Sequence, residues 1–390
     1  MTTRTTNAMR RATFIGAAVL GGLAAAGGAQ AGPTVQFGDE GSMTFTYAVQ
    51  GWYRNIDYKA AGRDESDFYL RRNRLALSGQ YNDQIGFYAQ LEGGGNPGSD
   101  EKIYFRDAYV TFDYRDELRF IVGRFKNTFS RENLEACLEP LTMDRSELLA
   151  YTPYGGTRDE GAAVWGNLLD GRFQYRFMVA NGRHDDAAPE HRPRYTARVH
   201  YSFLDPEYNY GYLGTYLGTS KVFTIGAAYD TQADIVYANY PMRTDRKSYK
   251  AWTADAFLEY PTTTGVYTVS GAYFKYDTGG VANMSADAAY PINGDMKGYY
   301  VKAGYMLPNK VGPGRLQFFA RHDKADYAKK VALTEYYDRT WNSIGVNYYL
   351  DGQKLKASAE FADIKFGTPY PGVSQLQDQK QVIIGLQFIF

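Results

Sequence analysis

The chain has 390 residues, of which 22% are charged and 16% aromatic, including 36 Tyr and 22 Phe. This composition is too polar for a bundle of membrane helices and too aromatic for a disordered chain. The formal net charge is zero, which excludes the broad basic field of a nucleic-acid-binding protein. The single cysteine, Cys137, excludes a disulfide framework and a cysteine-ligated metal site.

The first 31 residues have the pattern of an export signal. Three arginines precede an apolar run at 12–26, and the segment ends in small residues at 29–31. A basic start, a short apolar run and a small-residue cleavage site are typical of a secretory signal peptide. An uncleaved membrane anchor is the alternative, but the run is short and glycine-rich for a membrane span. We therefore predict a cleaved signal peptide at 1–31 and a mildly acidic mature protein at 32–390.

Apolar residues recur at every second position along most of the mature chain. From Val382 to Phe390, five apolar side chains at alternate positions enclose residues that include Gly385 and Gln387. A period of two indicates a β-strand with one apolar face. The same pattern predicts sixteen strands, at 42–55, 66–82, 84–94, 102–113, 116–126, 158–169, 172–181, 192–204, 221–231, 246–260, 265–278, 296–307, 314–325, 335–350, 354–367 and 377–390.

The connections between these strands alternate between tight turns and long polar loops. Short turns at one end and long loops at the other are typical of an outer-membrane barrel, in which closure leaves no unpaired strand edge in lipid. Long loops are expected at 56–65, 95–101, 127–157, 182–191, 232–245, 279–295, 326–334 and 368–376.

The alternation therefore predicts an all-β, 16-stranded antiparallel transmembrane β-barrel in contact with outer-membrane lipid. A soluble β-sandwich or a β-solenoid fits less well, because the chain shows neither a composition break nor a fixed repeat. One connection, 205–220, falls where a tight turn is due, and the sequence offers no reason for its length.

Several blocks resemble the phosphate-selective porin O/P family. The segment 67–79, DFYLRRNRLALSG, resembles that family's first-hairpin signature, and the blocks at 106–110, 122–126, 143–146 and 158–162 are similar to those that follow in it. Thr128, where the family usually has Pro, and Cys137 depart from the pattern.

The resemblance implies an outer-membrane porin for inorganic anions such as phosphate, usually a homotrimer, whose third long loop folds into the lumen. The final residue, Phe390, is similar to the ends of outer-membrane proteins generally, where the barrel assembly machinery reads it.

The longest predicted loop, at about 127–157, is the candidate constriction. Loops longer than about 15 residues are usually functional or disordered, and this one has apolar residues that can anchor it to a barrel wall. We therefore expect it to fold inward and narrow the pore. The alternative is an external loop that caps the barrel or packs against a neighbouring subunit. Its apolar anchors are Leu134, Leu138, Leu141, Leu148 and Leu149.

Basic residues in and beside this loop are the candidate anion contacts. Arg72 and Arg74 share one face of a strand, and a charge on the lipid face costs roughly 2–4 kcal/mol, so both are expected in the lumen. Arg71 is then expected to point away, toward the outer interface or a subunit contact. The candidate anion-binding residues are Arg72, Arg74, Arg124, Lys126, Arg131 and Arg145. The acids expected to pair with them are Asp107, Glu132, Glu135 and Asp144.

Other functions remain as alternatives. Porin lumens are polar whatever they pass, so a general or weakly cation-selective porin is the main one. A barrel enzyme would need a Ser–His pair in contact, but His200 and Ser202 are two residues apart on one strand, about 7 Å. An adhesin with a plugged lumen is a third alternative. The four histidines show no metal-ligand spacing and no glycine loop leads into a helix, so we predict a passive channel without catalytic residues or cofactor.

Overall fold

A computed structural model describes most of the mature chain. The described residues are 32–59, 62–95, 102–146, 148, 157–186, 188–239, 242–280, 295–327, 338–367 and 377–390. The predicted signal peptide at 1–31 and the expected anchor Leu149 lie outside them. Within these ranges no helix is long and apolar enough to cross a membrane.

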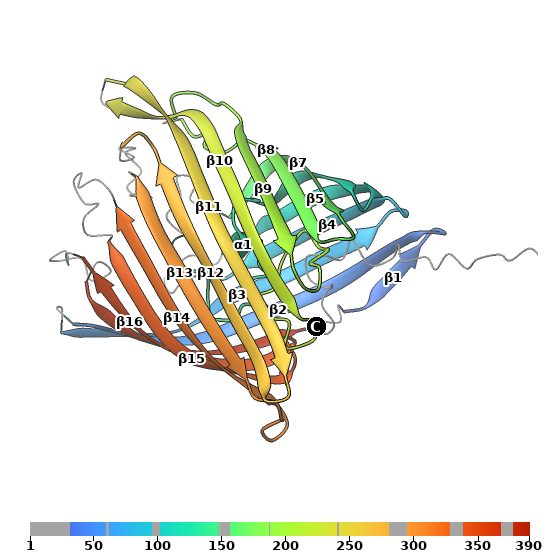
Figure 1. Ribbon diagram of the computed structural model, residues 1–390, viewed down its shortest axis with the longest axis vertical. Helices are drawn as coiled ribbons and strands as arrows, with labels where there is room; N and C mark the ends of the chain where they lie inside the picture. The colour runs from blue at the N-terminus through green and yellow to red at the C-terminus, as the bar shows by residue number, and fades with distance from the viewer. Residues whose placement is uncertain are drawn as a thin grey trace, which may run out of the picture.

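Sixteen antiparallel strands form a closed barrel, which confirms the predicted fold class. Each strand pairs with the next along the chain, and β17 pairs with β2, so the sheet has no open edge. Figure 1 shows β10 to β16 side by side as one tilted wall. The strands are β2 (Gly41–Tyr58), β3 (Arg63–Gln80), β4 (Ile85–Gly93), β5 (Tyr104–Arg115), β6 (Leu118–Lys126), β7 (Arg158–Leu168), β8 (Phe173–Ala180), β9 (Arg194–Ser202), β10 (Val222–Asn239), β11 (Thr244–Thr262), β12 (Gly265–Asp277), β13 (Met296–Met306), β14 (Arg315–Tyr327), β15 (Arg339–Asp351), β16 (Leu355–Phe366) and β17 (Gln379–Ile389).

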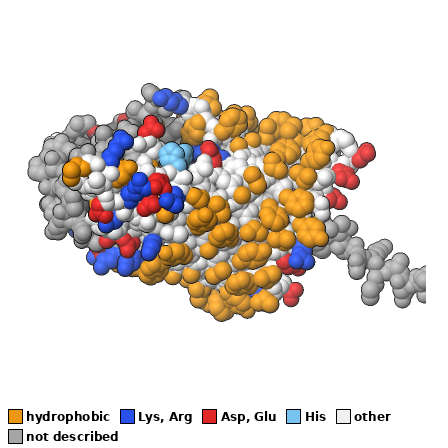
Figure 2. All heavy atoms as spheres, turned by 90° about the horizontal axis from the view of Figure 1, so that it is seen from above, with side chains coloured by type: hydrophobic (Ala, Val, Ile, Leu, Met, Phe, Trp, Pro, Cys, Tyr) orange, Lys and Arg blue, Asp and Glu red, His pale blue; other side chains and the backbone are white. Residues whose placement is uncertain are grey.

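Side chains alternate between the lumen and the outer surface along each strand. In β17, Val382, Ile384, Leu386 and Phe388 are exposed on the outer surface, whereas the residues between them are buried. Figure 2 shows the result, with hydrophobic side chains over the middle of the barrel and charged side chains toward its two ends. This apolar band is the surface that a membrane-spanning barrel presents to lipid.

Two of the expected long loops are wrong, because strands continue through them. β10 and β11 pair from Val222↔Glu259 as far as Asn239↔Thr244, so most of the expected loop at 232–245 is a protruding hairpin. β2 and β3 likewise pair as far as Tyr58↔Arg63. Beyond the apolar band both strand faces can be polar, so the hydrophobic alternation disappears although the backbone ladder continues.

A short strand that the alternation does not predict, β1 (Thr34–Phe37), folds back antiparallel onto the start of β2. All four of its residues are exposed. It therefore extends the barrel rim and adds nothing to the lumen.

Candidate pore constriction

The loop that follows β6 lies inside the barrel, as expected, and not over its mouth. We call the segment 127–157 the lumen loop. Ser130 caps its single helical turn, α1 (Arg131–Leu134), by accepting a hydrogen bond from Asn133 N at 3.1 Å. Its described residues are buried, except for Asp144, Arg145 and Thr157, which are partly exposed.

Apolar side chains anchor the lumen loop to one side of the wall. Leu141 and Met143 pack with Trp52, Phe319 and Ile383 of β2, β14 and β17. Leu138 packs with side chains of β2 and β17, and Phe129 and Leu148 with β10 to β14. Four of the five expected anchors are therefore buried in this packing or beside it, with Leu134 fully buried in the loop itself.

The unexplained connection at 205–220 is a second segment inside the barrel. We call it the lumen insert, because it enters from the end that carries the tight turns and meets the lumen loop. Ala136 N donates to Tyr212 O at 2.8 Å, and Tyr212 N donates to Leu134 O at 3.2 Å. Glu259 of β11 holds the insert from the wall by accepting hydrogen bonds from Thr215 and from two backbone amides.

A buried ion pair joins the two segments. Arg131 of the lumen loop makes a bidentate contact with Glu207 of the insert, with both nitrogen–oxygen distances at 2.7 Å. The guanidinium also lies over the rings of Tyr212 and Phe257, at 4.5 and 3.9 Å from their centroids. Arg131 is thus a structural clamp between loop and insert, and not a free anion contact.

Basic side chains gather around Cys137 on the inner edge of the lumen loop. Arg145 donates to Cys137 Sγ at 2.6 Å, and the other cations act on the thiol from the wall. We call this set the basic cluster. Its members are Arg74 of β3, Arg106 of β5, Lys126 of β6, Arg145 of the loop and Arg158 of β7.

Carboxylates neutralise only part of the basic cluster. Arg74 and Arg106 both contact Glu92, and Arg158 pairs with Asp107 at 3.0 Å. Lys126 donates to two loop carbonyls, Leu134 O and Glu135 O, at 3.0 and 2.6 Å. Among the described residues, neither Lys126 nor the Arg145 guanidinium forms an ion pair with a carboxylate, so the cluster carries a surplus of positive charge.

This surplus acts on the Cys137 thiol. Burial alone would raise the pKa of Cys137, but Arg145, Arg74, Lys126 and Arg158 outweigh burial and bring that pKa well below its usual range. The thiol therefore lies in a positive local potential.

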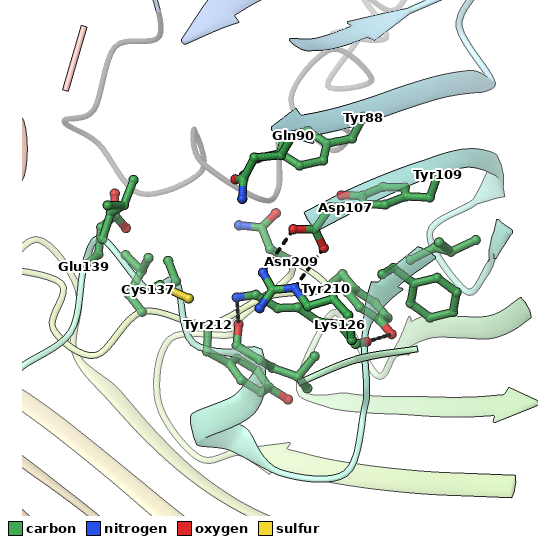
Figure 3. A pocket seen from close by; sticks show the side chains of 18 of the residues that line it. Tyr88, Gln90, Asp107, Tyr109, Lys126, Cys137, Glu139, Asn209, Tyr210 and Tyr212 are labelled. Atoms are coloured by element: carbon green, nitrogen blue, oxygen red, sulfur yellow. Dashed lines mark hydrogen bonds and ion pairs between the residues drawn. The ribbon is translucent and has the colours of Figure 1, made fainter. Parts of the chain in front are cut away.

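A cavity lies between the basic cluster, the lumen loop and the lumen insert (Figure 3). Its volume is about 100 Å³, and its wall comes from β3 to β7. Tyrosines and apolar side chains share the lining with Arg74, Lys126 and Arg158. The lumen loop packs against the opposite wall, so the open space lies on the β3–β7 side.

The expectation for Arg71 is wrong. In the pairing with β2, Gln50 lies opposite Arg72 and Gly51 opposite Leu70, so Arg71 is an extra residue in a β-bulge. A bulge changes the face to which the following side chains point. Arg71 therefore turns inward with Arg72, and both donate to Asp144 of the lumen loop at 2.8 Å.

The expectation for Arg124 is also wrong. It shares the outer face of β6 with Phe120 and Val122, and it pairs at 3.4 Å with Glu160, which is also exposed. Lys126, which the alternation would place on the same face, turns inward where the strand ends and joins the lumen loop.

The remaining acidic candidates also pair with bases in the lumen, but in the described part of the chain only Glu135 contacts a base that the sequence analysis named. Asp107 pairs with Arg158. Glu132 and Glu135 of the loop pair with Lys302 of β13, and Glu135 also lies 3.7 Å from Arg131.

Sequence reasoning missed Arg106, Arg158 and Lys302 as lumen groups. Arg106 is a second bulge residue, since Gln90 pairs with Asp107 and Leu91 with Phe105. His200, considered for an enzyme, faces the lumen and contacts the Tyr212 hydroxyl at 2.6 Å, not a serine. Among the described residues, no group of three or more His, Cys, Asp or Glu side chains could hold a metal ion.

Comparisons with known proteins agree with this architecture. The family model described as "Phosphate-selective porin O and P" matches residues 44–390. An uncharacterised protein of Aquifex aeolicus is 22% identical over 359 residues, covering 83% of this chain and 78% of its own.

Solved structures show a similar fold at low identity. OmpF of Salmonella typhi has a TM-score of 0.63 at 13% identity, covering 91% of this chain and 99% of its own. The outer membrane channel DcaP of Acinetobacter baumannii has a TM-score of 0.59 at 13% identity, covering 93% and 100%. OmpT of Vibrio cholerae in its trimer form has a TM-score of 0.52 at 11% identity, covering 90% and 100%.

Proposed function

Because the chain belongs to the phosphate-selective porin O and P family, we propose that it passes small hydrophilic solutes by passive diffusion and prefers anions such as phosphate. Family membership and the closed barrel make it an outer-membrane porin and point to a channel rather than an enzyme. The preference for anions is the more specific part of the proposal, and it depends on the charge around the cavity.

The surplus of positive charge in the basic cluster is the observation that carries the proposal. An anion that enters the cavity loses part of its hydration, and charge-assisted hydrogen bonds to guanidinium groups offset that loss. Arg74, Lys126 and Arg158 line the cavity directly. Two other bases named from the sequence do not line the cavity: Arg72 donates to Asp144, and Arg145 donates to Cys137.

A general porin is the second candidate, and one observation favours it. Glu139 of the lumen loop also lines the cavity, across from Arg74 and Arg158. Acid on the loop facing bases on the wall creates a transverse field, which serves cations and anions alike. The two candidates therefore differ in the sign and size of ion selectivity.

The proposal also covers the export of the chain, the assembly of the barrel and its oligomeric state. We infer that residues 1–31 are a cleaved signal peptide, on the basic, apolar and small-residue pattern of that segment. The Phe390 ring is exposed beside β2, where the assembly machinery could read it. A homotrimer is supported by the trimer form of the similar OmpT barrel.

The test is the reversal potential of the purified protein in a planar bilayer under a KCl gradient, repeated with phosphate. We expect chloride to be preferred and phosphate to block the chloride current. Lys126→Gln should lower the chloride-to-potassium permeability ratio roughly fivefold, because one charge at about 4 Å is worth about 1 kcal/mol in water-like surroundings.

Arg124→Gln is the matched control, since Arg124 leaves the same strand toward the outside. It should leave the ratio unchanged. A pore that prefers potassium, or one in which the two variants behave alike, would overturn the proposed anion preference and leave a general porin.

A further inference from the structure

The cavity beside the basic cluster has an aromatic wall as well as a charged one. Neighbouring rings follow one another from β4 to the lumen insert without a break. Tyr88 stacks on Tyr109 with centroids 5.4 Å apart, and Tyr109 meets Phe125 edge-on at 6.4 Å. Phe125 in turn meets Tyr210 of the insert at 6.3 Å, and Tyr210 meets Trp165 at 5.5 Å. All five rings line the cavity.

Polar donors stand beside these rings. Arg74 and Arg158 line the same cavity as Tyr88. The Gln90 side chain is 4% exposed, and its amide oxygen accepts from the Tyr88 hydroxyl at 2.8 Å. Its amide nitrogen has no hydrogen-bond partner among the described residues.

A buried amide donor without a partner is costly, which indicates that a ligand atom completes it. Figure 3 shows the Gln90 amide directed into the cavity, toward the side of Asp107 and Asn209. The missing partner must be an acceptor, since an amide nitrogen only donates. Arg74 and Arg158 line the same cavity, where they also contact Glu92 and Asp107.

Resting on the anion preference proposed above, we propose that the solute this cavity selects is an aromatic carboxylate, with its carboxylate at Gln90, Arg74 and Arg158 and its ring against Tyr109 and Tyr210. Phosphate would meet the same charged donors but would gain nothing from the ring faces. An aliphatic acid of equal charge would meet the same donors but would lose the ring contacts.

The size of the space agrees with a single ring. The cavity volume of about 100 Å³ is smaller than the roughly 150 Å³ cavity that is known to admit benzene. A single ring is therefore the largest group that the cavity can hold, which excludes long or branched acids.

The experiment compares three carboxylates as blockers of chloride current through the purified porin in a planar bilayer. Benzoate and cyclohexanecarboxylate have the same charge and nearly the same size, and acetate has neither ring. We expect half-block by benzoate at a concentration roughly 2- to 12-fold lower than for cyclohexanecarboxylate, the range that aromatic pairing adds to area burial, with acetate weakest.

Tyr109→Leu should remove the preference for benzoate and leave block by cyclohexanecarboxylate in place. Phe112→Leu is the matched control, because Phe112 lies on the same strand but on the outer surface. Tyr210→Leu removes the ring contact that the lumen insert supplies. It therefore tests the same site even if Tyr109→Leu distorts β5.

The outcomes separate this inference from the proposed function. A chloride-preferring pore that benzoate and cyclohexanecarboxylate block alike overturns this inference alone. A benzoate preference that survives both tyrosine variants also overturns it. A reversal potential without chloride preference in the same bilayers overturns both proposals.

Discussion

The clamp between the lumen loop and the lumen insert can be broken by removing one charge. Glu207→Gln keeps the size of the side chain but leaves the Arg131 guanidinium buried without its bidentate partner. Arg131 is 1% exposed and Glu207 5% exposed, so water cannot replace the lost contact. Glu207 also accepts hydrogen bonds from Thr224 at one carboxylate oxygen and from Tyr216 at the other, and the single amide oxygen of glutamine can retain only one of them.

The magnitude follows from the pKa of Glu207. Burial alone would raise that pKa, but Arg131 and its hydrogen bonds lower it from 4.5 to about 2. A difference of this size corresponds to about 3 kcal/mol of folding free energy. Breaking a buried pair by removing one partner typically costs roughly 3–5 kcal/mol. Because the folded pKa is the lower one, this contribution is complete above pH 4.5 and is lost as the pH falls through 2.

Two assays measure the effect. Urea unfolding in detergent or lipid, followed by the mobility shift of folded barrels in gels, should show the free energy of unfolding reduced by about 3 kcal/mol. Single-channel recording should show higher or noisier conductance, because the insert is released from the loop edge that borders the cavity.

Glu117→Gln is the control, since it makes the same substitution in a turn at the same end of the barrel. Its pair with Arg115 is largely exposed, and exposed pairs contribute about 1 kcal/mol or less. If Glu207→Gln is no more destabilising than Glu117→Gln and leaves conductance unchanged, the ion pair does not hold the insert. Adding Arg131→Met to Glu207→Gln should recover part of the lost stability, because no unpaired charge then remains.

Two further expectations concern the cavity. Burial raises the pKa of Glu139 to about 7, against the opposing effect of Lys356 and Lys126. Anion preference should therefore fall as the pH rises from 6 to 8, and the fall should be smaller in Glu139→Gln. Cys137 is the sole cysteine, so current block by methanethiosulfonates reports on it alone. The anionic sulfonatoethyl reagent should react about tenfold faster than the cationic trimethylammonium reagent, relative to their ratio on free cysteine; equal relative rates would contradict a net positive cluster.

The barrel could be predicted because its physics repeats along the chain. Every strand must place apolar side chains toward lipid and smaller or polar ones inward, so sixteen strands showed the same period of two. The inward fold of the lumen loop was also readable, since five leucines in a polar loop need a surface to pack on. The strand extensions beyond the membrane could not be predicted, because both strand faces can be polar there and the hydrophobic alternation disappears.

The lumen groups were only partly predictable, for a local geometric reason. Strand alternation correctly placed Arg72 and Arg74 inward, but one bulge reversed the expectation for Arg71 and another brought in Arg106. A bulge depends on how two strands pair and leaves no fixed residue pattern. The prediction for Arg124 was wrong for a different reason. Arg124 is close in sequence to the lumen loop, but its side chain lies on the outer face of β6.

The amino-acid composition of the lumen insert, and not only its length, indicates that it lies inside the barrel. Its sixteen residues contain four tyrosines, and a turn in water has no need of buried rings. Three of them lie inside the barrel, where Tyr212 pairs with the lumen loop and Tyr210 and Tyr216 line the cavity, whereas Tyr208 is exposed.

The two lumen segments also decide which part of the wall can select solutes. Sixteen strands alone would enclose a wide aqueous channel, in which most solutes would pass far from any side chain. The lumen loop covers the wall from β10 to β17, and the insert rises from the opposite end to meet its inner edge. The space left between them lies against β3 to β7. Both arginine bulges occur in this part of the wall, where they add inward charge beside that space. Selectivity in this barrel therefore depends on strand register as much as on residue type, and straightening a bulge should alter it without changing the net charge.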